Sequence, residues 1–207
     1  MGRAPATVLP SLRAGLTVQR DAGDDCHIAK SKTTITVAPP ATNAVDGTTP
    51  QEIQDSFTSA MTTVGGHVEV DAAYDACTNA SDTVTRATVD VTMTKHAFTW
   101  GTGRAQASQA DAAIIDRYFS LINAHEDRHI ARNKKAFKNA HKKLLNKKSD
   151  KAVAAYDGVQ CAAGQADEAL DNAEGCVRFT TNFAGAELVP VTTCGFDPPD
   201  YTGGICP

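Results

Sequence analysis

The chain has 207 residues, of which 42% are hydrophobic and 21% are charged, so it can bury one substantial core and has the composition of a globular protein. Its net charge of −4 gives no general reason to expect a nucleic-acid partner. No run approaches the roughly 20 apolar residues of a membrane-spanning helix. The N-terminal residues as they stand lack the continuous apolar stretch of a signal peptide.

Residues 1–32 are rich in Ala, Gly, Asp and Arg and are expected to form an irregular leader. A first strand is predicted at Thr33–Val37, where β-branched residues are frequent. A helix should begin after Thr49, because Thr is a good N-cap and Glu52 can complete a capping box. Gly65-Gly66 should stop that helix.

The next segments alternate like strands, at His67–Val70 and across Thr83–Thr94, with Trp100-Gly101 ending the second. From Ser108 the pattern stays helical to about Lys147, because neither Pro nor Gly interrupts it. A further helix is predicted from Ser149 to about Ala173, with Gly175 as its C-cap.

Residues 177–207 hold short strand-like pieces and a tail rich in Pro and Gly, and are expected to belong to the same domain as 33–176. The predicted fold class is α+β. A small, mostly antiparallel sheet with one crossing helix should pack on a long helical hairpin.

The chain has an even number of cysteines without a C-x-x-C pair, which favours up to three disulfides over a zinc knuckle. Cys194 and Cys206 would close a short loop in the tail. Disulfides indicate an oxidising compartment, so a secreted or otherwise exported protein is expected.

The segment that carries chemistry is His125-Glu126-Asp127-Arg128-His129, an H-E-x-x-H on the long helix. Residues four apart lie on one face of a helix, about 6 Å apart along its axis. His125 and His129 can therefore bind one Zn²⁺, and Glu126 beside it can act as the general base of a metallopeptidase. The alternative is a pair of core or surface histidines that bind no metal.

A third protein ligand is needed for a catalytic zinc site. A hairpin that turns near Lys148-Ser149 brings the level of the two histidines opposite residue 170 of the next helix. Asp171 is therefore the preferred third ligand, with Glu174 and Glu168 as alternatives. The remaining acids of this stripe, which includes Asp167, could orient histidine Nδ1–H groups.

In the order of these parts the chain resembles the bacterial family of predicted secreted zinc-dependent proteases. The resemblance rests on the helix start at Gly47–Glu52, the strand Val89–Val91 that leads to Trp100, the H-E-x-x-H, and Asp171. It implies a zinc-dependent peptidase that cleaves a peptide or protein substrate. Around Asp171 the Tyr, Thr and His of the family's signature are absent, and Cys176 stands where the His is expected.

A weaker resemblance joins Leu16–Arg20 to linkers in metalloprotease-like cargo of bacterial contractile injection systems, which would agree with export without a signal peptide. For the peptidase, Val89–Thr94 is a candidate edge strand to bind the substrate. A residue that stabilises the transition state is not evident, since Tyr118, Tyr156, His96 and His141 all qualify.

Two other functions stay open. Nine of the 20 basic residues lie between Arg128 and Lys148, with no acid among them. This helix could bind an anionic partner in a non-catalytic module, although a solvated face is the simpler interpretation. The chain could also be an inactive metallopeptidase relative in which the zinc is structural.

Overall fold

The computed structural model describes residues 14–18, 26–61, 67–194, 201, 202, 204 and 206, with backbone alone at 14–18 and 57–61. Its strands are β1 (Ala14–Val18), β2 (Lys32–Val37), β3 (Ala41–Val45), β4 (His67–Thr78), β5 (Val84–Trp100), β6 (Cys176–Phe179) and β7 (Ala186–Val189). Its helices are α1 (Pro50–Met61), α2 (Gln109–Phe137), α3 (Ala140–Leu144) and α4 (Ser149–Glu174), with 3-10 turns at Thr181–Phe183 and Val191–Cys194. The mixed α+β class is confirmed.

The main sheet has the order β1-β4-β5-β2, and β3 also pairs with β5. Only β4 and β5, which form a hairpin, are antiparallel; β1 is parallel to β4, and both β2 and β3 are parallel to β5. The prediction of a mostly antiparallel sheet is therefore wrong for the strands that the structure describes. The outer strands precede the hairpin at a distance in sequence, so no tight turn sets their direction.

Strands β2 and β3 follow each other along the same side of β5, with Pro39 and Pro40 between them. Proline has no N–H to give to a ladder, so the pair interrupts what would otherwise be one strand. Val89–Thr94 lies in β5 with β4 on one side and β2 on the other. The proposal that this segment is an edge strand is therefore wrong.

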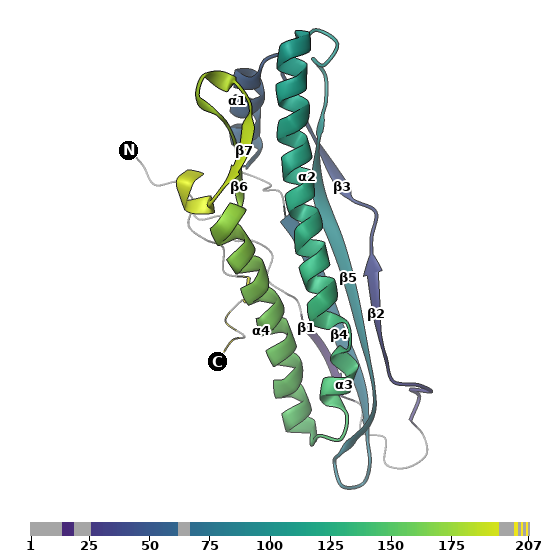
Figure 1. Ribbon diagram of the computed structural model, residues 1–207. Coiled ribbons are helices and arrows are strands. Elements are labelled where there is room, and N and C mark those ends of the chain that lie inside the picture. Colours follow the sequence, from purple (N-terminus) through teal and green to yellow (C-terminus); the bar gives the residue numbers. More distant parts are fainter. Residues whose placement is uncertain are drawn as a thin grey trace.

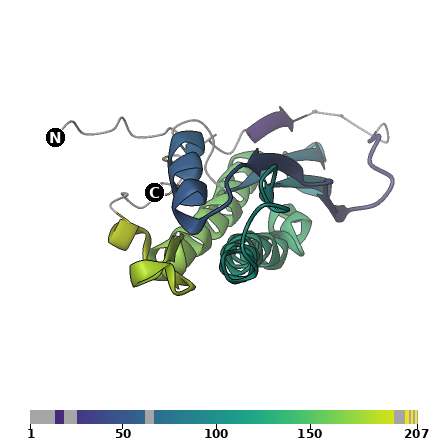
Figure 2. The same ribbon diagram turned by 90° about the horizontal axis from the view of Figure 1, so that it is seen from above.

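The two long helices α2 and α4 lie side by side against one face of the sheet (Figures 1 and 2). On β5 the residues that point toward the helices are almost completely buried, and the alternate Asp90 and Thr92 are exposed. This period of two is that of a sheet covered on one face. The main apolar cluster joins Ala87, Val89, Val91 and Met93 of β5 to Ile130, Phe137, Tyr156, Val159 and Ala163 of the helices.

Helix α2 begins where the sequence predicts, because Ser108 Oγ accepts a hydrogen bond from the Asp111 N–H at 3.1 Å. The helix does not continue to Lys147. It ends at Phe137, and α3 starts at Ala140 after Asn139, which has a non-helical φ of −136°. Ala140 and Leu144 are buried in the main cluster, so the break allows α3 to pack its own apolar face against the sheet. No Pro or Gly marks this break.

The predictions for the N-terminal part of the chain have different outcomes. Ala14–Val18, inside the expected irregular leader, is a strand that pairs with β4. The helix at Thr49 is confirmed: the Glu52 N–H donates to Thr49 Oγ1 at 3.3 Å, and the Glu52 carboxylate reaches back to the Thr48 N–H at 2.7 Å. The predicted stop at Gly65-Gly66 lies outside the described residues, as does most of the leader.

All six cysteines form disulfides, in the pairs Cys26–Cys77, Cys161–Cys206 and Cys176–Cys194. The expected Cys194–Cys206 loop is therefore wrong, because Cys206 joins the tail to α4 and Cys194 pairs with Cys176 at the start of β6. Three disulfides indicate an oxidising, extracellular environment. None of the described helices carries an apolar stretch long enough to cross a membrane.

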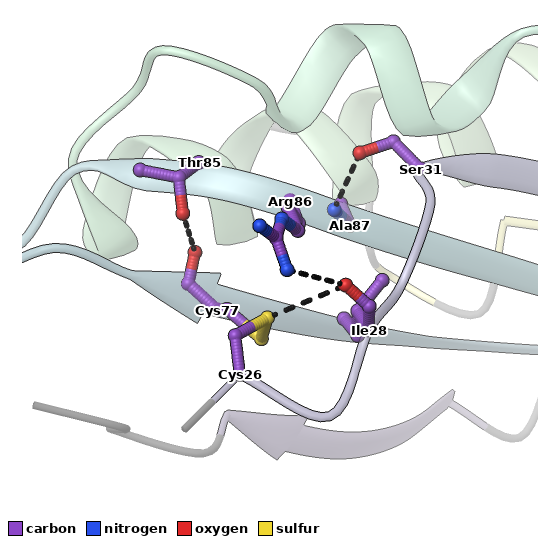
Figure 3. The surroundings of a disulfide bond; sticks show 7 residues. All are labelled: Cys26, Ile28, Ser31, Cys77, Thr85, Arg86 and Ala87. Carbon is purple, nitrogen blue, oxygen red and sulfur yellow. Dashed lines mark hydrogen bonds between the residues drawn. A yellow bond between two sulfur atoms is a disulfide. The ribbon is translucent and has the colours of Figure 1, made fainter. Parts of the chain in front are cut away.

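The first disulfide fastens the segment before β2 to β4 (Figure 3). Near it, Arg86 Nη1 donates to the Ile28 carbonyl at 3.1 Å and Ser31 Oγ accepts from the Ala87 N–H at 3.1 Å. Because the bond closes a long loop in the unfolded chain, we expect Cys26→Ser with Cys77→Ser to lower the free energy of unfolding by about 2–4 kcal/mol. Urea denaturation measures this, and an unchanged midpoint would contradict it.

Candidate metal centre

Three side chains from two helices meet at one point between α2 and α4. His125 Nε2 lies 2.8 Å from Asp171 Oδ1, His129 Nε2 lies 3.0 Å from the same oxygen, and the two nitrogens are 3.0 Å apart. These residues are only 3–5% exposed. In the part of the chain that the structure describes, they form a group that could hold a metal ion.

The antiparallel helices α2 and α4 bring these atoms together as the spacing predicts. His125 and His129 are one turn apart on α2, and they face Asp171 in the last turn of α4. Gly175 ends α4 by donating its N–H to the Asp171 carbonyl at 2.8 Å. Its missing side chain is needed, because a Cβ there would lie 2.6 Å from the Asp171 Cα. The contacts of His125 and His129 with Asp171 agree with the predicted pairing of residue levels in the hairpin.

A second carboxylate orients one of the imidazoles. Asp167 Oδ1 accepts from His129 Nδ1 at 2.8 Å, in the role that the acidic stripe predicts for it. Asn133 holds the other Asp167 oxygen, Oδ2, at 2.7 Å through its side-chain amide. An outer carboxylate of this kind fixes the tautomer and the ring orientation of a metal-binding histidine.

The hydrogen bonds around His129 Nε2 and Asp171 Oδ1 can be satisfied only if a positive charge lies between these atoms. The Asp167 carboxylate only accepts, so the proton of neutral His129 sits on Nδ1 and its Nε2 is an acceptor. That acceptor faces the Asp171 carboxylate, which also only accepts. A second proton on His129, or a metal ion, resolves the conflict.

The pKa shifts of His129 and Asp171 both favour the charged form of the side chain. Burial opposes protonation of His129, but hydrogen bonds to Asp167 and Asp171 outweigh it and raise its pKa to about 10. Burial would raise the pKa of Asp171, but hydrogen bonds from His125 and His129 hold it well below its usual range. The centre therefore favours a positive charge next to Asp171, which either a second proton on His129 or a metal ion can supply.

Glu126 is buried beside this group, with 3% of its surface exposed. Its Oε2 has no hydrogen-bond partner among the described residues. Burial raises its pKa to about 8, although the charge of His129 opposes the shift. A buried carboxyl oxygen without a hydrogen-bond partner costs stability and is typical of a functional site.

The alternative third ligands lie outside the group. Glu174 forms an ion pair with Arg128, whose Nε is 2.8 Å from Glu174 Oε1. Glu168 is half-buried and does not belong to the metal-capable group of described residues.

None of the four candidate transition-state stabilisers belongs to the group either. Tyr118 stacks on Phe179, Tyr156 packs against Tyr74, His96 stacks on His67, and His141 Nδ1 lies 2.9 Å from Thr33 Oγ1. The structure adds a tyrosine that the sequence analysis missed. The Tyr201 hydroxyl donates to Asp171 Oδ2, while the contacts with the two histidines are made by Oδ1. Tyr201 lies in the tail, 30 residues from Asp171, and no motif links the two.

Comparison with known proteins places the chain in a family. Residues 40–176 match the family described as "Bacterial protein of unknown function (DUF922)". The chain belongs to this family. The DUF922 match spans the sheet hairpin, α2 and α4, and so includes His125, Glu126, His129 and Asp171. No curated protein and no solved structure gives a significant match.

Proposed function

We propose that this protein is a zinc-dependent metallopeptidase that hydrolyses peptide bonds in a peptide or protein substrate. The observation that carries the proposal is the convergence of His125 Nε2, His129 Nε2 and Asp171 Oδ1, with buried Glu126 next to it. Two histidines and a carboxylate are a usual ligand set for a catalytic zinc ion. The three disulfides favour an exported protein.

In this proposal His125, His129 and Asp171 hold the metal, and Asp167 keeps His129 in the tautomer that leaves Nε2 free. A zinc ion held by these residues would supply Lewis-acid chemistry, which would polarise the scissile carbonyl and lower the pKa of a water molecule. Glu126 takes the proton from the attacking water and gives it to the leaving amine. A carboxyl whose pKa lies near the working pH serves well in both steps.

The test is the metal content and the hydrolytic activity of the same preparation. After dialysis without added zinc, we expect about one equivalent of zinc per chain by elemental analysis, as for a single centre with three protein ligands. An unstructured protein substrate should be cleaved, a chelator should stop the cleavage, and zinc should restore it. Zinc without cleavage of any of a panel of peptides would favour an inactive relative with structural zinc.

The second candidate function is binding of an anionic partner. Helix α3 lies at the end of the helical hairpin (Figure 1). Six exposed lysines lie between the last turns of α2 and the residues after α3, and we call them the lysine surface: Lys134, Lys135, Lys138, Lys142, Lys143 and Lys147. None of the ion pairs between described residues involves them. Such a surface attracts polyanions through charge.

Retention on immobilised heparin tests this second candidate. Changing Lys134, Lys138 and Lys142 to Gln should clearly lower the salt concentration at which the protein elutes. Each lysine removed takes away one charge contact with the polyanion and so weakens binding. Changing Arg104, Arg117 and Arg178 to Gln is the matched control, since these exposed residues lie near the start of α2, away from α3, and the change removes the same charge. Equal elution of the two variants would argue against the lysine surface.

A further inference from the structure

Tyr201 completes the surroundings of Asp171. Its hydroxyl donates to Asp171 Oδ2, and its ring lies 5.8 Å from the His129 ring between centroids. Asp171 Oδ1, the other oxygen of the same carboxylate, is the atom that faces both histidine nitrogens. Tyr201 therefore holds the carboxylate oxygen that does not contact the histidines.

The tail that carries Tyr201 is attached to α4 at two points. Gly164 is the first, because a Cβ there would lie 2.7 Å from the Tyr201 carbonyl oxygen and 3.1 Å from the Thr202 nitrogen. The absence of a side chain lets the tail backbone lie directly on the helix, although Gly costs about 1 kcal/mol in a helix interior. The Cys161–Cys206 disulfide is the second.

These attachments share a helix face with the proposed ligand. Cys161, Gly164, Asp167 and Asp171 follow one another at intervals of three or four residues, and all are buried on α4. The same helix therefore positions the third ligand and the tail residue that touches it. Tyr201 lies beyond residues 40–176, so the family match does not include this contact.

We propose that Tyr201 is a positioning residue of the metal centre, held in place by Gly164 and the Cys161–Cys206 disulfide. A carboxylate can rotate and can offer a metal either one oxygen or both. A hydroxyl bonded to Oδ2 selects the orientation in which Oδ1 alone points at the histidine nitrogens, as outer hydrogen bonds do in metal sites generally. This inference rests on the proposed metal centre.

The test is the zinc affinity of Tyr201→Phe, measured by competition with a chelating indicator. We expect the affinity to fall by about 10- to 100-fold, the usual effect of losing an outer-shell partner. Tyr156→Phe is the matched control, because Tyr156 is a buried tyrosine on the same helix whose hydroxyl has no described partner. Its zinc affinity should equal that of the wild type.

Two further measurements separate positioning from a merely structural role. The visible spectrum of the Co²⁺-loaded protein reports the ligand geometry, and it should change in Tyr201→Phe but not in Tyr156→Phe. Cys161→Ser with Cys206→Ser keeps the hydroxyl but releases the tail, so its zinc affinity should also fall.

The outcomes distinguish the two proposals. A wild type that binds no zinc overturns the metal centre and this inference with it. A wild type that binds zinc, with Tyr201→Phe equal to it in affinity and in Co²⁺ spectrum, leaves the metal centre standing and overturns the role of Tyr201. The same holds if only the disulfide variant loses affinity.

Discussion

Replacement of Glu126 by Gln should lower kcat/KM for peptide hydrolysis by at least about 100-fold, the lower end of what a general base contributes. Gln has nearly the same shape but cannot take a proton from water. Metal content should stay at the wild-type level, because Glu126 is not one of the three converging ligands. The measurement is steady-state hydrolysis together with elemental analysis of the same sample.

The chain offers a close control at the next position. Asp127 is also acidic, but it is exposed and its Oδ1 lies 2.6 Å from the Lys95 ammonium group. Asp127→Asn should therefore keep nearly full activity. Equal activity of Glu126→Gln and wild type would show that Glu126 is not the base. Equal losses in the two variants would point to a general effect of charge on this helix.

In the metal-free protein, Glu126→Gln should also stabilise the fold toward alkaline pH. Its folded pKa of about 8 lies above the ordinary carboxyl value, so the buried group costs stability once the pH exceeds that ordinary value. The cost grows until the pH passes about 8. A glutamine does not ionise, so the urea midpoint of the variant should fall less than that of the wild type between pH 5 and about 9.

The parts of the fold and site that the sequence predicted depend on local spacing. Two histidines four residues apart on a helix share a face whatever the tertiary structure, and a helical hairpin with a known turn fixes which levels oppose each other. The sequence was therefore sufficient to predict that His125, His129 and Asp171 lie close together. The helix starts at Thr49 and Ser108 could be predicted as well, because capping is a local interaction.

The parts that were missed depend on long-range pairing. The directions of β1, β2 and β3 follow from which edge of the β4–β5 hairpin each strand meets, and no turn signal records that choice. The break between α2 and α3 arises because Ala140 and Leu144 gain burial against the sheet, which the helical pattern alone cannot show. The disulfide partner of Cys206 lies on α4, far from it in sequence.

The tail illustrates the same limit at the site itself. A Tyr in a segment rich in Pro and Gly carries no periodic signal, and its contact with Asp171 exists only because the tail lies on α4. The faint signals were Gly164, which a helix would not otherwise favour, and Cys161 one turn before it. Read together with Cys206, they point to a chain segment fastened on that helix.

Replacement of His129 should abolish stoichiometric zinc binding. His129 Nε2 is one of the three converging atoms, and its Nδ1 satisfies Asp167. The loss should exceed the roughly 10- to 100-fold effect of an outer-shell change, because a ligand itself is removed. Elemental analysis after dialysis should find about one equivalent of zinc in the wild type, as a single three-ligand centre requires, and almost none in His129→Ala.

His129→Ala also removes one hydrogen-bond partner from each of the buried carboxylates Asp167 and Asp171, which can cost several kcal/mol and prevent folding. His129→Gln keeps a side-chain amide that can donate to a carboxylate, so it should fold and still lack zinc. His141→Ala is the control, because His141 contacts Thr33 away from the centre. Full zinc content in a folded His129→Gln would exclude this histidine as a ligand. Loss of zinc in His129→Gln with retention in His141→Ala would place the metal between α2 and α4.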